Sequence, residues 1–416
     1  DSSIYAKGEG AVYPVIDIKN SLPLVSRVIV GNGVGGSTSK RYFYKNLRAH
    51  TRGLGSLGFE VISSTDESTK ISTETIYSQD WQNRTHGLVK KESRWYAISA
   101  TARSFPPSII SGLTHTAILN TTLNNLASLR NSNFYFPYIS LSTTVKTDLN
   151  DASQGAFSSE TLYNAANWQV QSTTNCASNA GFSLTAPVSC ANLSGKLRTL
   201  VTNFDYYPAN LSSLLPPLLK TKIETATVAG TAPPFQPSTE TRKTAYEYLS
   251  TGVLSKEIIE PDSTTLKMTT ETLYNSQGLP VSVTTTGSDI VSRTSSVLYD
   301  SQGRITQKTN ALGHAENVYY EDARFPWLAT KTVGPNGIAT SAIYDSFGRQ
   351  LEEIRADGTR SRTERHWCSN NNGCPFAFAK FYEKTESTGS APSITYFDEL
   401  GRAVASESQG YDDGMV

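Results

Sequence analysis

The side chains best suited to metal binding, disulfide formation or catalysis in this 416-residue sequence are four cysteines and five histidines. The cysteines form two local pairs, Cys176 with Cys190 and Cys368 with Cys374. A zinc site is one interpretation, with His366 as an added ligand, but structural zinc prefers the short C-x₂₋₄-C spacing, which neither pair has. Two disulfides fit better, because the chain otherwise has the character of an extracellular protein. We therefore expect disulfides and no metal site.

Motifs for catalysis or cofactor binding are missing from the sequence. The histidines are scattered and stand in no H-E-x-x-H spacing. The glycine-rich stretch 31–36 lacks the Gly-Lys-Ser/Thr ending of a P-loop, and a predicted strand, not a helix, follows it at 40–44. A hairpin tip explains this stretch better. With no G-x-S-x-G elbow and no marked pair of carboxylates, the sequence predicts neither an enzyme nor a cofactor.

Aromatic residues are the remaining candidates for a binding surface. Trp81, Trp95 and Trp168 could stack on sugars, which would make the protein a glycan-binding module. Packing across a sheet is the alternative, and it is the ordinary role of aromatic side chains in β structure. We favour packing for these three residues.

Composition restricts the class of protein. Lys plus Arg and Asp plus Glu both number 37, so the formal net charge is zero, which argues against general electrostatic binding of nucleic acid or anionic lipid. Only 18% of residues are charged, while 21 tyrosines and abundant Thr favour β structure. No apolar run reaches the roughly 18 residues of a membrane span. Because the chain has no initial Met and no signal peptide, we expect both ends to be cuts through a longer polypeptide.

A repeat organises the second half of the chain. Its copies share an aromatic anchor, an Asp or Asn, a turn glycine and, in most copies, an arginine. The clearest copies are Tyr274 with Gly278; Tyr299, Asp300, Gly303 and Arg304; Tyr344, Asp345, Gly348 and Arg349; and Phe397, Asp398, Gly401 and Arg402. With degenerate anchors at Tyr248 and Tyr320, successive anchors from 248 to 344 lie 21 to 26 residues apart. A repeat of this period predicts a stacked array of equal units.

One unit of this repeat predicts an antiparallel hairpin. Each anchor ends a short Thr- and Val-rich alternating run, which is typical of a strand. The Asp or Asn side chain accepts backbone N–H groups, and the glycine supplies positive φ, so a turn follows. A second turn comes about ten residues later, for example at Asn336-Gly337 and Asp357-Gly358. Because one hairpin alone is marginally stable, we expect many to pair laterally into a long antiparallel sheet that curves or spirals.

The arginines that follow the turn glycines admit two interpretations. Arg304, Arg349 and Arg402 could form a row of anion or sugar contacts. Alternatively, they are turn residues that pair with neighbouring acids or lie over the aromatic anchors. We favour the structural role, because residues that recur with a repeat usually serve it.

These units resemble the RHS/YD repeat, whose pattern is roughly Tyr-Asp-x-x-Gly-Arg followed by a second glycine turn. The first half narrows the resemblance: the segments 42–60 and 75–81 are similar to the start of the RHS wall in the B component of insecticidal Tc toxins. The resemblance implies a hollow shell of spiralling hairpins around a C-terminal toxic cargo, secreted or on the cell surface, whose partners are the remainder of its own chain or a partner shell chain. The self-cleavage signature of that family is absent; Asp412-Asp413-Gly414 comes closest.

The resemblance leads to a three-part organisation. We expect a propeller-to-wall segment with the first strands at 1–103, degenerate repeats with insertions at 104–245, and YD repeats at 246–416. A separate embedded domain is the alternative for the middle part, where Ile118 to Leu129 has near-helical apolar spacing and predicts a short helix. The expected function is a structural wall segment without catalysis; the alternative is a glycan- or cell-binding module of the teneurin type.

Overall fold

The computed structural model shows an all-β chain. It describes residues 4–19, 23–31, 36–96, 117–130, 134–148, 153–181, 184–209, 215–229, 237–368, 374–376 and 378–410. Within these ranges there are 27 strands and no helix, and accordingly no helix that could span a membrane. The strands belong to one long, mostly antiparallel sheet. The predicted fold class is confirmed.

The chain divides into two compact units. Unit 1 comprises Asp1–Val30, Thr38–Tyr246 and Ser250–Gly252, and unit 2 comprises Gly31–Ser37, Glu247–Leu249 and Val253–Val416. The strands that lie wholly or mainly in unit 1 are β1 (Tyr5–Ala6), β2 (Val15–Asp17), β3 (Arg27–Gly31), β4 (Ser37–His50), β5 (Gly55–Asp66), β6 (Ile71–Tyr77), β7 (Val89–Tyr96), β8 (Ala117–Arg130), β9 (Tyr135–Thr147), β10 (Ser153–Tyr163), β11 (Val170–Ser178), β12 (Lys196–Tyr206), β13 (Leu219–Val228) and β14 (Ser238–Tyr248).

Unit 2 has shorter strands. They are β15 (Leu254–Ile259), β16 (Met268–Tyr274), β17 (Pro280–Gly287), β18 (Arg293–Tyr299), β19 (Ile305–Thr309), β20 (Ala315–Tyr319), β21 (Lys331–Val333), β22 (Ala339–Tyr344), β23 (Gln350–Ile354), β24 (Arg360–Trp367), β25 (Phe381–Ser387), β26 (Ser393–Phe397) and β27 (Ala403–Ser408).

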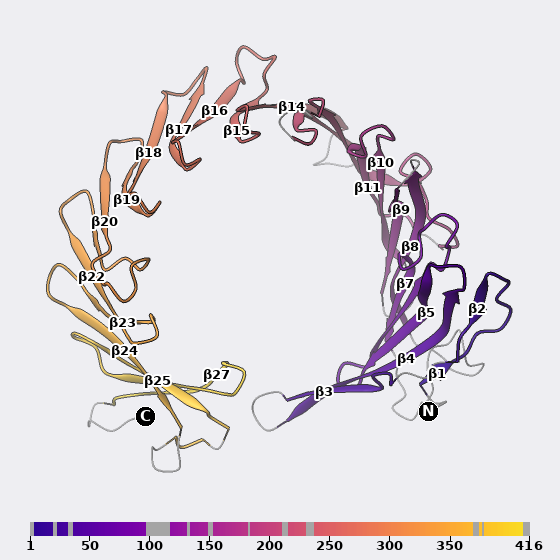
Figure 1. Cartoon of the computed structure of the whole chain (residues 1–416), viewed down its shortest axis with the longest axis horizontal. Helices are drawn as coiled ribbons and strands as arrows, with labels where there is room; N and C mark the ends of the chain where they lie inside the picture. Colours follow the sequence, from indigo (N-terminus) through magenta and orange to yellow (C-terminus); the bar gives the residue numbers. More distant parts are fainter. Residues whose placement is uncertain are drawn as a thin grey trace. The chain divides into compact units, whose positions relative to one another are not determined.

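Each strand of unit 2 pairs antiparallel with the next strand in sequence, from β15 to β27. The same rule holds in unit 1 from β4 to β14. At its start β2 pairs antiparallel with β4, and β1 pairs parallel with β4. Successive strands can be followed side by side within each unit in Figure 1. Because almost every connection is a local hairpin, the fold follows the order of the sequence.

The aromatic anchors mark irregular positions in the ladder. The register shifts immediately before Tyr274, Tyr299, Tyr344 and Phe397, so each anchor lies at a β-bulge at the end of its strand. A bulge bends its strand and increases the local twist. The repeat therefore places one such bend at the same point of successive units.

The turns after the anchors combine a tight turn with a left-handed glycine. In the turn after Tyr299, the N–H of Gly303 donates to the carbonyl of Asp300 at 3.1 Å, and φ of Gly303 is 79°. The N–H of Asp300 then donates to the carbonyl of Arg304 at 3.0 Å, which closes the hairpin. This is the three-residue loop in which a left-handed residue completes a bulge, and it requires glycine at one position only.

Little of the sheet is covered by a second layer. Among the described residues of unit 2, the buried side chains are Glu352, Ala379, Tyr396 and Asp398. Among the described residues of unit 1, an apolar cluster of buried residues comprises Val145, Ala156, Cys176, Cys190 and Leu193. Hydrogen bonds and cross-strand pairs, such as Thr284 with Thr294 at 2.9 Å between hydroxyls, must therefore supply much of the stability.

The predicted helix at 118–129 is wrong. This segment lies inside β8, which pairs with β7 on one side and β9 on the other. Its apolar residues have helical spacing, but Asn120-Thr121-Thr122 and Asn124-Asn125 between them are poor helix formers. Two flanking strands offer the backbone a complete set of hydrogen bonds, and this tertiary context overrides the spacing.

Candidate functional site

The turn carboxylates of the repeat make the same contacts in three copies. Asp300 Oδ1 accepts the N–H groups of Gln302 and Arg304, both at 2.9 Å, and its Oδ2 accepts Nε–H of Arg304 at 2.6 Å. Asp345 and Asp398 hold the equivalent residues in the same way, including Arg349 and Arg402. Each carboxylate thus binds the turn that follows it and orients the arginine.

These contacts lower the pKa of each carboxyl. The N–H and guanidinium of Arg304 lower the pKa of Asp300, and those of Arg402 do the same for Asp398, whose side chain is almost wholly enclosed. At Asp345 desolvation opposes the effect, but the N–H and guanidinium of Arg349 still lower the pKa. A carboxylate that accepts several hydrogen bonds is stabilised in its charged form.

The guanidinium groups of the repeat are engaged within the sheet. Besides its carboxylate, Arg304 lies over the ring of Tyr320, with 4.7 Å between the guanidinium carbon and the ring centroid. Arg349 lies over Phe347 at 5.1 Å. The structure therefore places Arg304 and Arg349 among residues of the repeat array, where they order turns and cover aromatic rings of the same copy or the next one.

The anchor tyrosines connect one hairpin to the previous one. The hydroxyl of Tyr274 donates to the carbonyl of Leu254 at 2.7 Å, and that of Tyr299 to the carbonyl of Pro280 at 2.9 Å. Tyr344 donates to Ala329 at 2.7 Å. Phe397 has no hydroxyl, so the last copy lacks this link. At this position tyrosine thus adds a hydrogen bond that phenylalanine cannot make.

Unit 1 contains degenerate anchors that the glycine pattern does not reveal. Register shifts also precede Tyr77, Tyr163 and Tyr206. The sequence Glu-Thr-Leu-Tyr-Asn occurs at both 160–164 and 271–275, which is the signal that finds the copy at Tyr163. It was missed because the left-handed residue of the following turn is Trp168, with φ of 59°, instead of glycine.

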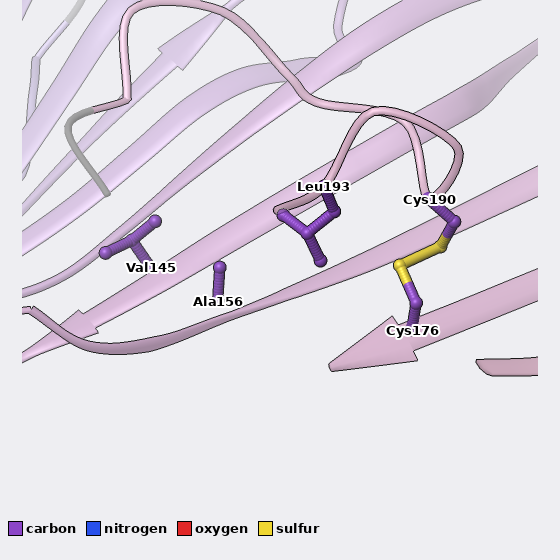
Figure 2. Packing of buried hydrophobic residues seen from close by; sticks show 5 residues of the cluster. All are labelled: Val145, Ala156, Cys176, Cys190 and Leu193. Atoms are coloured by element: carbon purple, nitrogen blue, oxygen red, sulfur yellow. A yellow bond between two sulfur atoms is a disulfide. The ribbon is translucent and has the colours of Figure 1, made fainter. Parts of the chain in front are cut away.

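One disulfide fixes a segment over the sheet of unit 1. Cys176 on β11 is bonded to Cys190, as predicted for this pair, and the segment 184–195 covers β9 and β10. Figure 2 shows Leu193 beside Ala156 and Val145 on the strands, and Cys190 joined to Cys176 by the disulfide. We call the segment 184–195 the strap.

Polar contacts hold the strap as well. Thr143 Oγ1 contacts both the N–H and the carbonyl of Val188, at 2.8 and 3.0 Å. The carboxylate of Glu160 accepts the N–H of Cys190, and Lys196 Nζ donates to the carbonyl of Cys190 at 2.9 Å. The strap is the insertion that gives unit 1 its covered core.

The second predicted disulfide, Cys368–Cys374, is also formed. The four sulfur atoms are therefore not zinc ligands. His366 lies instead against Tyr382, with ring centroids 5.1 Å apart, and its Nε2 is 3.3 Å from Glu364. Within the described ranges, no three His, Cys, Asp or Glu side chains are grouped as a metal site would require. Residues 32–35 of the glycine-rich stretch and Asp412 to Gly414 lie outside the described residues.

The three tryptophans lie in different surroundings. Trp95 on β7 is buried. Trp81 packs on His50 with 4.5 Å between ring centroids. Trp168 stacks on Phe136 at 6.2 Å and also contacts Phe134, whose side chain is 62% exposed. They do not form one surface.

The arrangement of these strands is similar to part of the fold of the Tc toxin TcdB2-TccC3. The likeness is to three crystal structures: TcdB2-TccC3 without the hypervariable C-terminal region, TcdB2-TccC3-TEV and TcdB2-TccC3-Cdc42. Their TM-scores are 0.62, 0.63 and 0.63, at 8%, 8% and 9% identity. The likeness covers 90%, 91% and 91% of this chain but 28%, 29% and 29% of theirs, so it spans less than a third of those chains.

Sequence comparison adds no family assignment. No family model matches the chain, and no curated protein matches it. The structural likeness at this identity concerns the fold alone.

Proposed function

We propose that this chain is a wall segment of a secreted RHS/YD-repeat protein, in which the sheet encloses a C-terminal cargo. The observation that carries the proposal is the likeness to TcdB2-TccC3 over about nine tenths of the chain. The remainder of the same polypeptide, or a partner shell chain, would complete the wall. In this role the chain contributes a scaffold and no catalysis.

Three features of the chain support the proposal. The Asp-Arg turns and tyrosine links recur along unit 2, so a sheet can be extended by adding hairpins without a new core. Most side chains of unit 2 are only partly covered, as in a single layer. Two disulfides suit a protein that works outside the reducing cytosol.

Protease protection in the complete protein tests the proposal. A cleavage site for a sequence-specific protease is placed in the polypeptide that follows the wall, and the rate of cutting is compared with that of the same segment as a free peptide. An enclosing wall predicts strong protection in the native protein, lost when the wall is unfolded by urea. Cutting of the native protein at the rate of the free peptide would refute enclosure.

A further inference from the structure

A pair of arginines in unit 1 is held over one tyrosine ring. Arg84 lies in the loop between β6 and β7, and Arg130 is the last residue of β8. Tyr135 begins β9 and is the direct cross-strand partner of Arg130. The guanidinium carbons of Arg84 and Arg130 are 5.2 and 5.1 Å from the ring centroid of Tyr135. Three elements thus bring two positive charges to one tyrosine ring.

Neither guanidinium has an acidic partner within the described part of the chain. This differs from the repeated turns, where an arginine four residues after an aspartate pairs with it, as Arg304 does with Asp300. Asp80 and Arg84 have the same spacing, yet Asp80 accepts the N–H groups of Gln82 and Asn83 and the side chain of Asn83. The guanidinium of Arg84 therefore does not pair with Asp80 and lies over the ring of Tyr135 instead.

The backbone of Arg84 is also held in an unfavourable conformation. Its φ is 59°, in the left-handed region, which costs a residue other than glycine roughly 1–2 kcal/mol. Glycine would avoid this cost, as it does at Gly303. The loop instead retains a charged side chain and directs it to the ring of Tyr135.

We propose that Arg84, Arg130 and Tyr135 form a binding site for an anionic carbohydrate. Guanidinium groups form paired hydrogen bonds with carboxylate and sulfate oxygens, and stacking on the tyrosine limits the rotamers that binding must fix. The Tyr135 hydroxyl, which has no protein partner within the described residues, adds a donor for a sugar oxygen. The ligand is a sulfated or uronic-acid sugar unit within a short glycan.

The size of the site favours a glycan over a protein partner. A specific protein interface buries about 1,200–2,000 Å² and has several buried anchors. Here two guanidiniums lie around the ring of one tyrosine, which also carries a hydroxyl, and this small set of groups matches one or two charged sugar units. Phe134 directly precedes Tyr135 at the same end of the hairpin. It is 62% exposed, so its ring offers an apolar surface to a neighbouring sugar. The inference is independent of the proposed wall function.

Binding of a fully sulfated heparin-type hexasaccharide to the 416-residue chain tests the site. The measurement is calorimetric titration at physiological salt, beside neutral maltohexaose, inorganic sulfate and hexaglutamate. Arg84→Gln and Arg130→Gln should each weaken binding of the sulfated sugar about tenfold, the loss expected for one charge-assisted hydrogen bond. Arg84→Lys, which keeps the charge but loses the planar fork, should also weaken it.

The matched control is Arg41→Gln, which removes one positive charge from an arginine of unit 1 that is paired with Glu67. It should leave affinity within twofold. Circular dichroism of every variant checks the fold. No saturable binding, or equal binding by the Arg84→Gln/Arg130→Gln variant, would overturn the site. Equal affinity for hexaglutamate would overturn the carbohydrate assignment in favour of an acidic polypeptide, and equal affinity for inorganic sulfate would reduce it to an anion site.

Discussion

The tyrosine hydroxyl is the smallest group on which the regularity of unit 2 depends. The hydroxyl of Tyr299 reaches back to Pro280 at the start of the adjacent strand β17, and that of Tyr344 reaches back to Ala329, just before β21. This side-chain bond adds to the backbone ladder, because it joins the end of one strand to the place where the preceding strand begins. The sequence predicts an aromatic residue at the anchor, but the acceptor is a backbone carbonyl, which no side-chain pattern encodes.

We predict that Tyr299→Phe lowers the free energy of unfolding of unit 2 by about 1 kcal/mol, because one hydrogen bond is lost and the ring is kept. Urea unfolding with hydrogen exchange of the 275–305 peptides measures the effect. Tyr319→Phe is the control, since Tyr319 is 42% exposed and its ring lies against Lys331. An equal loss in both variants would contradict the link.

The turn carboxylates give unit 2 an acid sensitivity. Because the pKa of Asp398 is lowered in the folded state, its charged form contributes stability above its unfolded pKa, and this is lost as the pH falls through the folded pKa. In Asp398→Asn the amide can still accept the turn N–H groups, as Asn275 and Asn310 do. We expect the wild type to be more stable than the variant at pH 7 and the difference to vanish in strong acid. Unfolding midpoints of the wild type and of Asp398→Asn across pH measure this difference in stability. A difference that stays constant with pH would refute the stabilising role of the charged Asp398.

At the scale of elements, the sequence predicts strands and turns well where a glycine marks the turn. Gly278, Gly303, Gly348 and Gly401 all have positive φ, between 74° and 80°. The prediction fails where another residue takes that conformation, as at Trp168, and where apolar spacing alone suggests a helix, as in β8. Both failures have one cause: the neighbouring strands, not the local sequence, decide the conformation.

We expect Gly358→Ala to destabilise unit 2 by roughly 1–2 kcal/mol. Its φ is 83° and an added Cβ would meet nothing within 4 Å, so the loss reports backbone strain alone. Gly334→Ala is the matched control: its φ is not positive and the nearest atom, the carbonyl oxygen of Ile338, is 3.7 Å from the added Cβ. Urea unfolding of both variants compares them, and equal losses would show that the left-handed conformation is not the cause.

The strap is the element that the repeat pattern does not predict. A local Cys176–Cys190 disulfide is expected from the extracellular character of the chain, but the strap's place over β9 and β10 depends on contacts with Thr143 and Glu160, which are distant in sequence. The Thr143 hydroxyl on β9 and the Glu160 carboxylate on β10 face the strap, but nothing in the sequences of these two strands marks them for this role. Only the folded sheet brings them under the strap.

Removing the strap's disulfide should weaken unit 1. We predict that Cys176→Ala with Cys190→Ala lowers its unfolding free energy by about 2–4 kcal/mol, since a cross-link restricts the unfolded chain. Cys368→Ala with Cys374→Ala should cost less, because its residues are 6 apart instead of 14. Hydrogen exchange of the 140–160 peptides reports on the covered strands. Unchanged exchange there in the first variant would mean that the strap is held without the disulfide.

At the scale of the molecule, unit 2 is stabilised by neighbour contacts along the sequence. Each strand pairs with the strand before and after it, and buried side chains are few among the described residues. Stability in such an array is close to a sum of unit and interface terms. This is why a repeat readable in the sequence predicts the sheet, whereas the strap and the arginines over Tyr135 depend on contacts between distant segments.

An array of this kind should tolerate the loss of one complete repeat. Deleting Asn275–Tyr299 removes β17 and β18 and joins Tyr274 directly to the Asp300 turn, so β16 meets β19 through the same kind of turn as before. We predict a folded protein with β-type circular dichroism and a lower unfolding free energy, because one set of interfaces is gone. Deleting Asn275–Gly287 removes β17 alone; β16 and β18 run in the same direction, and so short a connection cannot join parallel neighbours. This variant should aggregate or be cut rapidly by protease. If both deletions behave alike, whole hairpins are not the units in which this sheet is built.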